Sequence, residues 1–153
     1  MISVRRKFPG PDAGDLDTFL GISSVLTGFS RLDLEGTGMV RTYYETFARG
    51  TPGMTTAAFF ALARTVLSRD SHAAIDEGVR RQIITDPTFG PLSQSLIKLW
   101  YYATWSSNIV SAKAYVEGLV WPAIGTHPRG AKQPGFGTWA LPPPGPPSRD
   151  GEK

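Results

Sequence analysis

The stretch LSQSLIKLWYYAT, residues 92–104, is the most apolar helical segment of the chain. Its apolar residues recur every three or four positions, which places them on one side of an α-helix. We therefore expect a helix over residues 92–104 with one side buried in a helical core. That buried side consists of Leu92, Leu96, Leu99, Trp100 and Ala103.

The same stretch contains the densest cluster of rings in the chain, Trp100, Tyr101, Tyr102 and Trp105. Successive residues of a helix are about 100° apart, so these rings cannot all face one core. Either the helix is central and is covered on several sides, or some rings meet another protein, where Tyr and Trp are enriched. We favour the protein interface.

Helical spacing of apolar residues continues on both sides of this segment, over residues 15–27, 39–49, 57–68, 71–84 and 111–120. Gly28 is expected to end the first of these helices. Thr55 or Thr56 is expected to cap the third, and Ser71 the fourth. Convincing strand alternation is lacking, so the sequence predicts an all-α fold, a compact bundle of five or six helices.

The two ends of the chain have a different composition. Residues 1–14 are interrupted by Pro and Gly and are expected to form an extended N-terminal arm ahead of a helical body, residues 15–120. Residues 121–153 are expected to form an extended Pro/Gly-rich C-terminal tail, since 14 of these 33 residues are Pro or Gly. The tail also contains Trp121, Phe136 and Trp139, which must pack either on the chain's own helices or in a groove of a partner.

Composition excludes several classes of protein. The 153 residues include no cysteine, so disulfides, thiolate metal sites and covalently attached haem are excluded. The formal net charge is only +3 and the basic residues are scattered, which argues against a nucleic-acid partner. No run approaches the roughly 20 apolar residues of a membrane-spanning helix, so no membrane span is expected.

Motifs for catalysis or cofactor binding are not found either. Gly36-Thr37-Gly38 begins like a dinucleotide-binding loop, but Arg41 stands where the third glycine belongs. His72, at an expected helix start, is interpreted as a surface residue, and His127 as a loop residue that makes a local hydrogen bond. We therefore assign no catalytic, cofactor-binding or metal-ligating residue to this chain.

Several stretches resemble the small (gamma) subunit of bacterial FAD-dependent sugar and polyol dehydrogenases, the sorbitol, fructose, gluconate and glucose dehydrogenase group. The most specific are WPAIGTHP, residues 121–128, and PGFGTW, residues 134–139. Residues 17–29, 36–38 and 84–105 add to the resemblance, which covers about residues 15 to 142.

The resemblance implies a non-catalytic accessory subunit. In that family the large subunit binds FAD and oxidises the hydroxyl group of the substrate, and a cytochrome c subunit with c-type haem, where present, accepts the electrons. The small subunit supports maturation of the large one and usually supplies a twin-arginine export signal, so a periplasmic location is implied. Arg5-Arg6 lacks the apolar segment of such a signal, which leaves a cytoplasmic complex open.

The residues expected to contact the flavoprotein partner are the aromatic side chains of the last helices and the tail, together with one histidine. Two other functions stay open: a stand-alone helical enzyme using His72 or His127 as a base, and a helical nucleic-acid-binding domain whose binding weakens steeply with salt. The predicted interface residues are Trp100, Tyr101, Tyr102, Trp105, Trp121, His127, Phe136 and Trp139.

Overall fold

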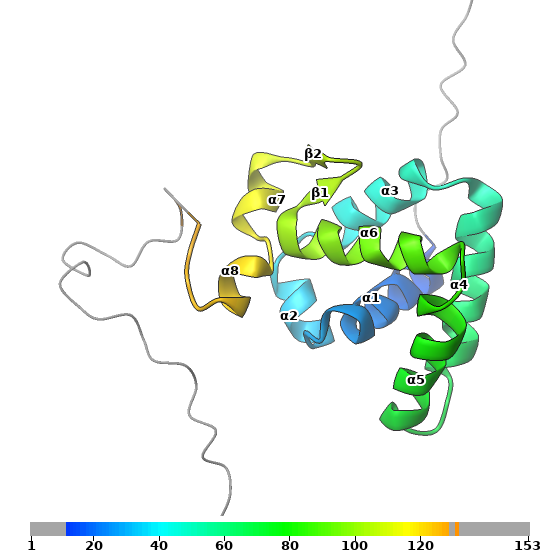
Figure 1. The fold of residues 1–153 in the computed structure, drawn as a ribbon. Coiled ribbons are helices and arrows are strands. Elements are labelled where there is room, and N and C mark those ends of the chain that lie inside the picture. The colour runs from blue at the N-terminus through cyan, green and yellow to red at the C-terminus, as the bar shows by residue number, and fades with distance from the viewer. Residues whose placement is uncertain (1–11, 129–130, 132–153) are drawn as a thin grey trace, which may run out of the picture.

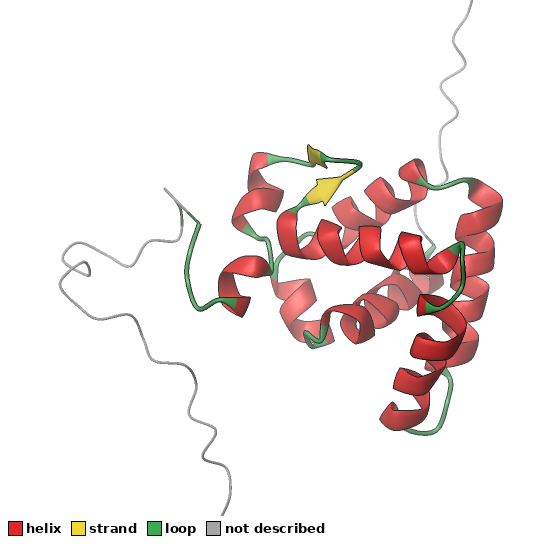
Figure 2. Ribbon diagram, in the orientation of Figure 1, coloured by secondary structure: helices red, strands yellow, loops and turns green. Residues whose placement is uncertain are grey.

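The computed structural model describes residues 12–128 and 131, and it is helical apart from one short hairpin (Figures 1 and 2). The predicted all-α fold and compact helical bundle are therefore confirmed. The predictions for residues 1–11, 129–130 and 132–153, including most of the arm and the tail, lie outside the described residues. In chain order the elements are α1 (Ala13–Thr27), α2 (Arg31–Gly36), α3 (Val40–Gly50), α4 (Gly53–Leu67), α5 (His72–Gly78), the π-helical segment η1 (Val79–Ile84), α6 (Phe89–Tyr102), β1 (Thr104–Trp105), β2 (Asn108–Ile109), α7 (Ala112–Val116) and α8 (Val120–Ala123).

Helix α6 crosses the middle of the body and packs on α1, α3 and η1 (Figure 1). Leu96, Leu99 and Trp100 of α6 are fully buried, as the spacing of the sequence predicted. The Trp100 ring meets Tyr43 edge to face at 4.8 Å and lies 6.3 Å from Phe19. Because Trp100 has no exposed surface, the prediction that it contacts a partner is wrong.

Local capping signals explain several helix ends. Gly28 ends α1 in the left-handed conformation, with φ of 77°, as predicted. Ser71 caps α5 as predicted, because its side chain accepts a hydrogen bond from the amide of Ala74 at 3.2 Å. The start of α4 was predicted wrongly: the helix begins at Gly53, directly after Pro52, rather than at a cap by Thr55 or Thr56.

The end of α6 turns into a hairpin that the sequence did not reveal. Ala103 takes a left-handed conformation, which ends the helix before Thr104. Trp105 pairs with Asn108, and the two residues between them, Ser106 and Ser107, have φ of 47° and 68°. Positive φ at both central positions is the signature of a type I′ turn, whose twist suits an antiparallel pair.

The predicted helix over residues 111–120 is broken into α7 and α8 at Gly118. A side chain on Gly118 would come 2.8 Å from the backbone oxygen of Tyr101, so the chain passes close to the end of α6 there. The amide of Leu119 donates to the carbonyl of Trp100 at 3.0 Å, which fixes the start of α8. Helix α8 also crosses the predicted tail boundary at residue 121, because a proline is tolerated in a first helical turn.

Within residues 12–128 and 131, none of the helices combines the length and the apolar character needed to cross a lipid bilayer.

Candidate partner-binding surface

A groove of about 560 Å³ lies where α2 meets α7, α8 and the segment that follows α8. We call it the α2–α8 groove. Its walls are mainly apolar and aromatic, with carboxylates at Asp33 and Glu117. The lining residues are Phe29, Leu32, Asp33, Gly36, Thr37, Val116, Glu117, Gly118, Leu119, Trp121, Pro122, Thr126, His127 and Pro128.

Helix α2 forms one wall, and a capping box sets where it begins. The Ser30 hydroxyl accepts from the amide of Asp33 at 3.2 Å, and the Asp33 carboxylate accepts from the amide of Ser30 at 3.1 Å. Leu34 is fully buried and anchors the helix to the core. Leu32 therefore points away from that core and is 76% exposed at the groove.

Trp121 forms the opposite wall in a fixed orientation. Its indole Nε1–H donates to the carbonyl of Tyr115 at 2.8 Å, and the two rings meet edge to face at 5.3 Å. The amide of Thr126 then donates to the carbonyl of Trp121 at 2.9 Å, through a turn that includes Gly125 at φ of 68°. These contacts hold the Trp121 ring at the groove without a partner.

His127 lines the same groove and is half-buried. Its Nδ1 lies 3.3 Å from the carbonyl oxygen of Pro128, a local hydrogen bond of the kind predicted, in which Nδ1 donates. Within the part of the chain that the structure describes, no three His, Cys, Asp or Glu side chains are placed to hold a metal ion together. The arrangement suits recognition of a ligand by shape and apolar contact.

The structure brings only some of the predicted interface residues to this groove. Tyr101 packs against Phe29, which lines the groove: the two rings meet edge to face at 6.1 Å, and the Tyr101 hydroxyl donates to the carbonyl of Thr27 at 2.9 Å. Tyr102, at the end of α6, is exposed. Trp105 packs instead over Gly50 and against Phe47, at 5.9 Å, away from the groove lining. Phe136 and Trp139 lie outside the described residues.

Sequence reasoning missed the exposed aliphatic side chains around the groove. Leu32 lies between the helices predicted over residues 15–27 and 39–49, where no helix was expected, although the Ser30 and Asp33 capping pair could have revealed α2. Ile124 is 65% exposed just after α8. The large hydrophobic side chains exposed on α2, the end of α6, β2, α7 and the residue after α8 all belong to elements at the same end of the body (Figure 1). They are Leu32, Tyr102, Ile109, Tyr115 and Ile124.

His72 lies in a second groove, of about 450 Å³, between α1, α4 and α5. Asp76 follows His72 by one helical turn and lines the same groove. The guanidinium of Arg31, which also lines this groove, donates to the carbonyl of Asp17 at 2.7 Å and forms an ion pair with the Asp17 carboxylate at 3.1 Å. The Arg31–Asp17 pair of this groove therefore joins α2 to α1.

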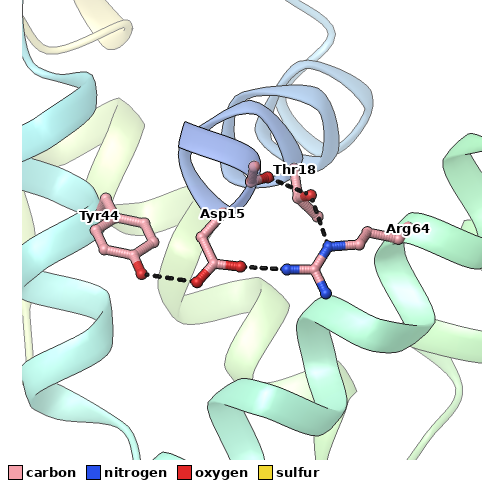
Figure 3. A network of polar contacts seen from close by, with 5 residues as sticks. Asp15, Thr18, Tyr44 and Arg64 are labelled. Carbon is pink, nitrogen blue, oxygen red and sulfur yellow. Dashed lines mark hydrogen bonds and ion pairs between the residues drawn. The ribbon is translucent and has the colours of Figure 1, made fainter. Parts of the chain in front are cut away.

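A polar network joins α1, α3 and α4 beside this groove (Figure 3). Asp15 pairs with the guanidinium of Arg64, whose Nε donates to the Thr18 hydroxyl at 3.3 Å. The hydroxyl of Tyr44 donates to the other oxygen of Asp15 at 3.5 Å. Burial, and then the negative charge of Asp15, raise the pKa of Tyr44 above its ordinary value. The network therefore holds α1, α3 and α4 together, and the phenol of Tyr44 acts in it as a protonated hydrogen-bond donor.

Fold and groove together define an all-α body with a groove, lined by apolar, aromatic and acidic side chains, at one end. Comparisons with protein-family models, curated proteins and solved structures gave no match.

Proposed function

We propose that this chain is a non-catalytic accessory subunit that binds and stabilises the large flavoprotein subunit of a sugar or polyol dehydrogenase. FAD belongs to that partner, and c-type haem, where present, to a third subunit. The resemblance of residues 121–128 and 134–139 supplies the identity of the partner and its periplasmic location. The observation that supports binding is the α2–α8 groove with its exposed apolar surroundings.

The apolar side chains around the groove favour contact with another protein. Leu32 and Ile124 are 76% and 65% exposed, and each would contribute about 1 to 2 kcal/mol on burial, a fraction of the value for a fully buried aliphatic side chain. Trp121 is already held in place by its hydrogen bond to Tyr115, so little side-chain entropy is lost when a partner covers it. Aliphatic side chains around a fixed indole form the kind of centre that dominates protein interfaces.

The polar groups with shifted pKa values support an internal structural role. Tyr43 is fully buried, and its hydroxyl donates to the carbonyl of Ala114 at 3.4 Å. Burial, and then the charge of Glu117, raise the pKa of Tyr43. Tyr44 has the same kind of shift within the Asp15 network. Both phenols stay protonated at neutral pH and act as hydrogen-bond donors within the body.

The proposal is tested by changing the groove surface without changing the core. Leu32→Asp places a charge at the groove, and Met54→Asp places the same charge at an 89% exposed position at the start of α4, outside the groove lining. Each tagged variant is expressed with the genes that neighbour its own, and flavin absorbance of the purified material is measured. We expect the flavoprotein to co-purify with Met54→Asp and to be lost with Leu32→Asp.

Equal recovery of flavoprotein with both variants would show that the groove is not the contact surface. Recovery with neither variant, nor with the unchanged chain, would contradict the proposed function itself. Circular dichroism of both variants serves as the control, because both substitutions are at exposed positions and should leave the helical signal unchanged.

A further inference from the structure

We propose that the α2–α8 groove recognises an arginine side chain of the partner, through the ring of Trp121 and the carboxylates of Asp33 and Glu117. The origin of this arginine rests on the proposed function, since the flavoprotein subunit is the partner that would carry it. The preference of the groove for a guanidinium group is a property of the isolated chain, and it follows from the charges and the ring that line the groove.

The lining of the groove is acidic. Its ionisable side chains, among the residues that the structure describes, are Asp33, Glu117 and His127, without Lys or Arg. Burial, and then the charge of Glu117, raise the pKa of Tyr43, so the Glu117 carboxylate acts on its surroundings as a negative charge. In the tautomer of His127 that donates from Nδ1, the other ring nitrogen is an acceptor. The groove therefore offers acceptors and negative charge to a ligand.

The basic residues on the helices around the groove are directed away from it. Helices α2 and α7 each contain one, Arg31 and Lys113. The Arg31 guanidinium forms its ion pair with Asp17 of α1, and the ammonium of Lys113 lies beside Gly38. Neither residue is part of the groove lining. A positive side chain that enters the groove thus meets a lining of opposite charge.

The carboxylate of Asp33 can accept further hydrogen bonds. Its bonds from the amide and from the hydroxyl of Ser30 both end on Oδ2. In the described part of the chain, no hydrogen bond to Oδ1 accompanies them. A carboxylate has about four lone-pair positions, and the planar fork of a guanidinium matches two of them. Capping of α2 and binding of an arginine are therefore compatible.

The ring of Trp121 favours arginine over lysine. Its indole N–H is already donated to the carbonyl of Tyr115, so the ring offers a ligand its aromatic surface rather than a donor. Cations are attracted to the face of Trp more strongly than to the other rings. A guanidinium is planar and weakly hydrated, and it stacks on such a face, whereas the ammonium of lysine is compact and strongly hydrated.

The apolar side chains around the groove contact the residues that flank the arginine in this arrangement. Leu32 lines the groove, and Ile124 is exposed just after α8. A carboxylate introduced at Leu32 would be covered by those flanking residues without a hydrogen-bond partner. Leu32→Asp is therefore expected to weaken binding even though a positive side chain enters the same groove.

The preference is tested on the isolated full chain with two small probes, N-acetylarginine amide and the uncharged N-acetylcitrulline amide of the same shape. We expect the arginine probe to shift the indole N–H signal of Trp121 in NMR spectra, with a dissociation constant of about 1 mM for a ligand of this size. The citrulline probe should bind about tenfold more weakly, and the signal of the buried Trp100 should stay in place. Equal binding of the two probes, or an unchanged Trp121 signal, would overturn the proposal.

Variants then assign the preference to the two carboxylates. Asp33→Asn keeps an acceptor for the amide of Ser30 and removes the charge, and Glu117→Gln removes the second charge. Glu35→Gln is the matched control, because Glu35 is exposed on α2 outside the groove lining. We expect the double variant to bind the arginine probe about tenfold more weakly and the control to bind it as the unchanged chain does. Equal affinities of the double variant and the control would overturn the proposal.

The same variants separate this inference from the proposed function. When each tagged chain is expressed with the genes that neighbour its own, we expect the double variant to recover less flavoprotein than Glu35→Gln recovers. Equal recovery with both would overturn the recognition of arginine and leave the proposed function standing. Loss of flavoprotein with every chain, the unchanged one included, would contradict the proposed function, whereas the probe titrations would still establish the preference of the groove.

Discussion

The substitution Gly50→Ala should destabilise the otherwise unchanged chain but not a chain that already carries Trp105→Ala. Gly50 is the last residue of α3, and a side chain there would overlap the Trp105 indole. Gly50→Ala must therefore push the ring of Trp105 away from its contact with Phe47. Overpacking of this kind costs about 1 to 3 kcal/mol, part of which is the lost ring pair, worth about 0.5 to 1.5 kcal/mol.

When the indole of Trp105 is removed, Gly50→Ala should no longer destabilise the chain and can be compared with Gly→Ala at any open helix end. In a Trp105→Ala background the space beside Gly50 is open, and only the backbone preference of the helix is left. Replacing Gly by Ala in a helix stabilises by up to about 1 kcal/mol, less at a helix end. The coupling between the two sites is then about 2 to 3 kcal/mol, well above the error of a double-mutant cycle.

Urea unfolding of the four chains, followed by circular dichroism, measures this cycle. We expect Gly50→Ala to lower the free energy of unfolding of the otherwise unchanged chain and to raise it, or leave it equal, in the Trp105→Ala chain. Additive effects of the two substitutions would refute the contact between the hairpin and the end of α3. They would also return Trp105 to the set of rings available for a partner.

Three further predictions concern single contacts. Ser71→Ala removes the cap of α5 and should lower the free energy of unfolding by about 1 kcal/mol, whereas Ser71→Asp should preserve most of it. The pKa of Tyr44 is raised above its unfolded value of 10.0, so the stability that its phenol contributes is complete below pH 10 and is lost as the pH rises further. Tyr44→Phe should therefore flatten the decline of the free energy of unfolding with pH above 10. An unchanged pH profile would refute the role of the phenol. Trp121→Phe keeps an aromatic wall but removes the donor to Tyr115, so amide exchange over residues 119–126 should accelerate several-fold while that of α6 is unchanged.

The helices were predictable where a local signal was sufficient. The spacing of Leu96, Leu99 and Trp100 placed the central helix, and Gly28 and Ser71 ended and capped helices through their own backbone preference and side chain. The break at Gly118 was not predictable, since it depends on the backbone of Tyr101, which lies close only after folding.

The groove was predictable only in part. Trp121 was identified because aromatic rings in a Pro/Gly-rich segment must pack on something, and His127 was included as the one histidine of that segment; both line the groove. Trp100 was misassigned because the ring cluster was treated as one interface, although the spacing of Trp100 with Leu96 and Leu99 already placed it on the buried side. Leu32 was missed because an aliphatic side chain on a six-residue helix has no helical period to show, and its exposure is set by the burial of Leu34.

The role of the chain as an accessory subunit can be tested by expressing the tagged, unchanged chain with the genes that neighbour its own and recording the visible absorption spectrum of the material that co-purifies. An accessory subunit should bring down a larger protein in fixed stoichiometry with the absorbance of bound flavin, and the flavin should leave with that protein when the two are separated. A colourless, monodisperse single chain would contradict the accessory role.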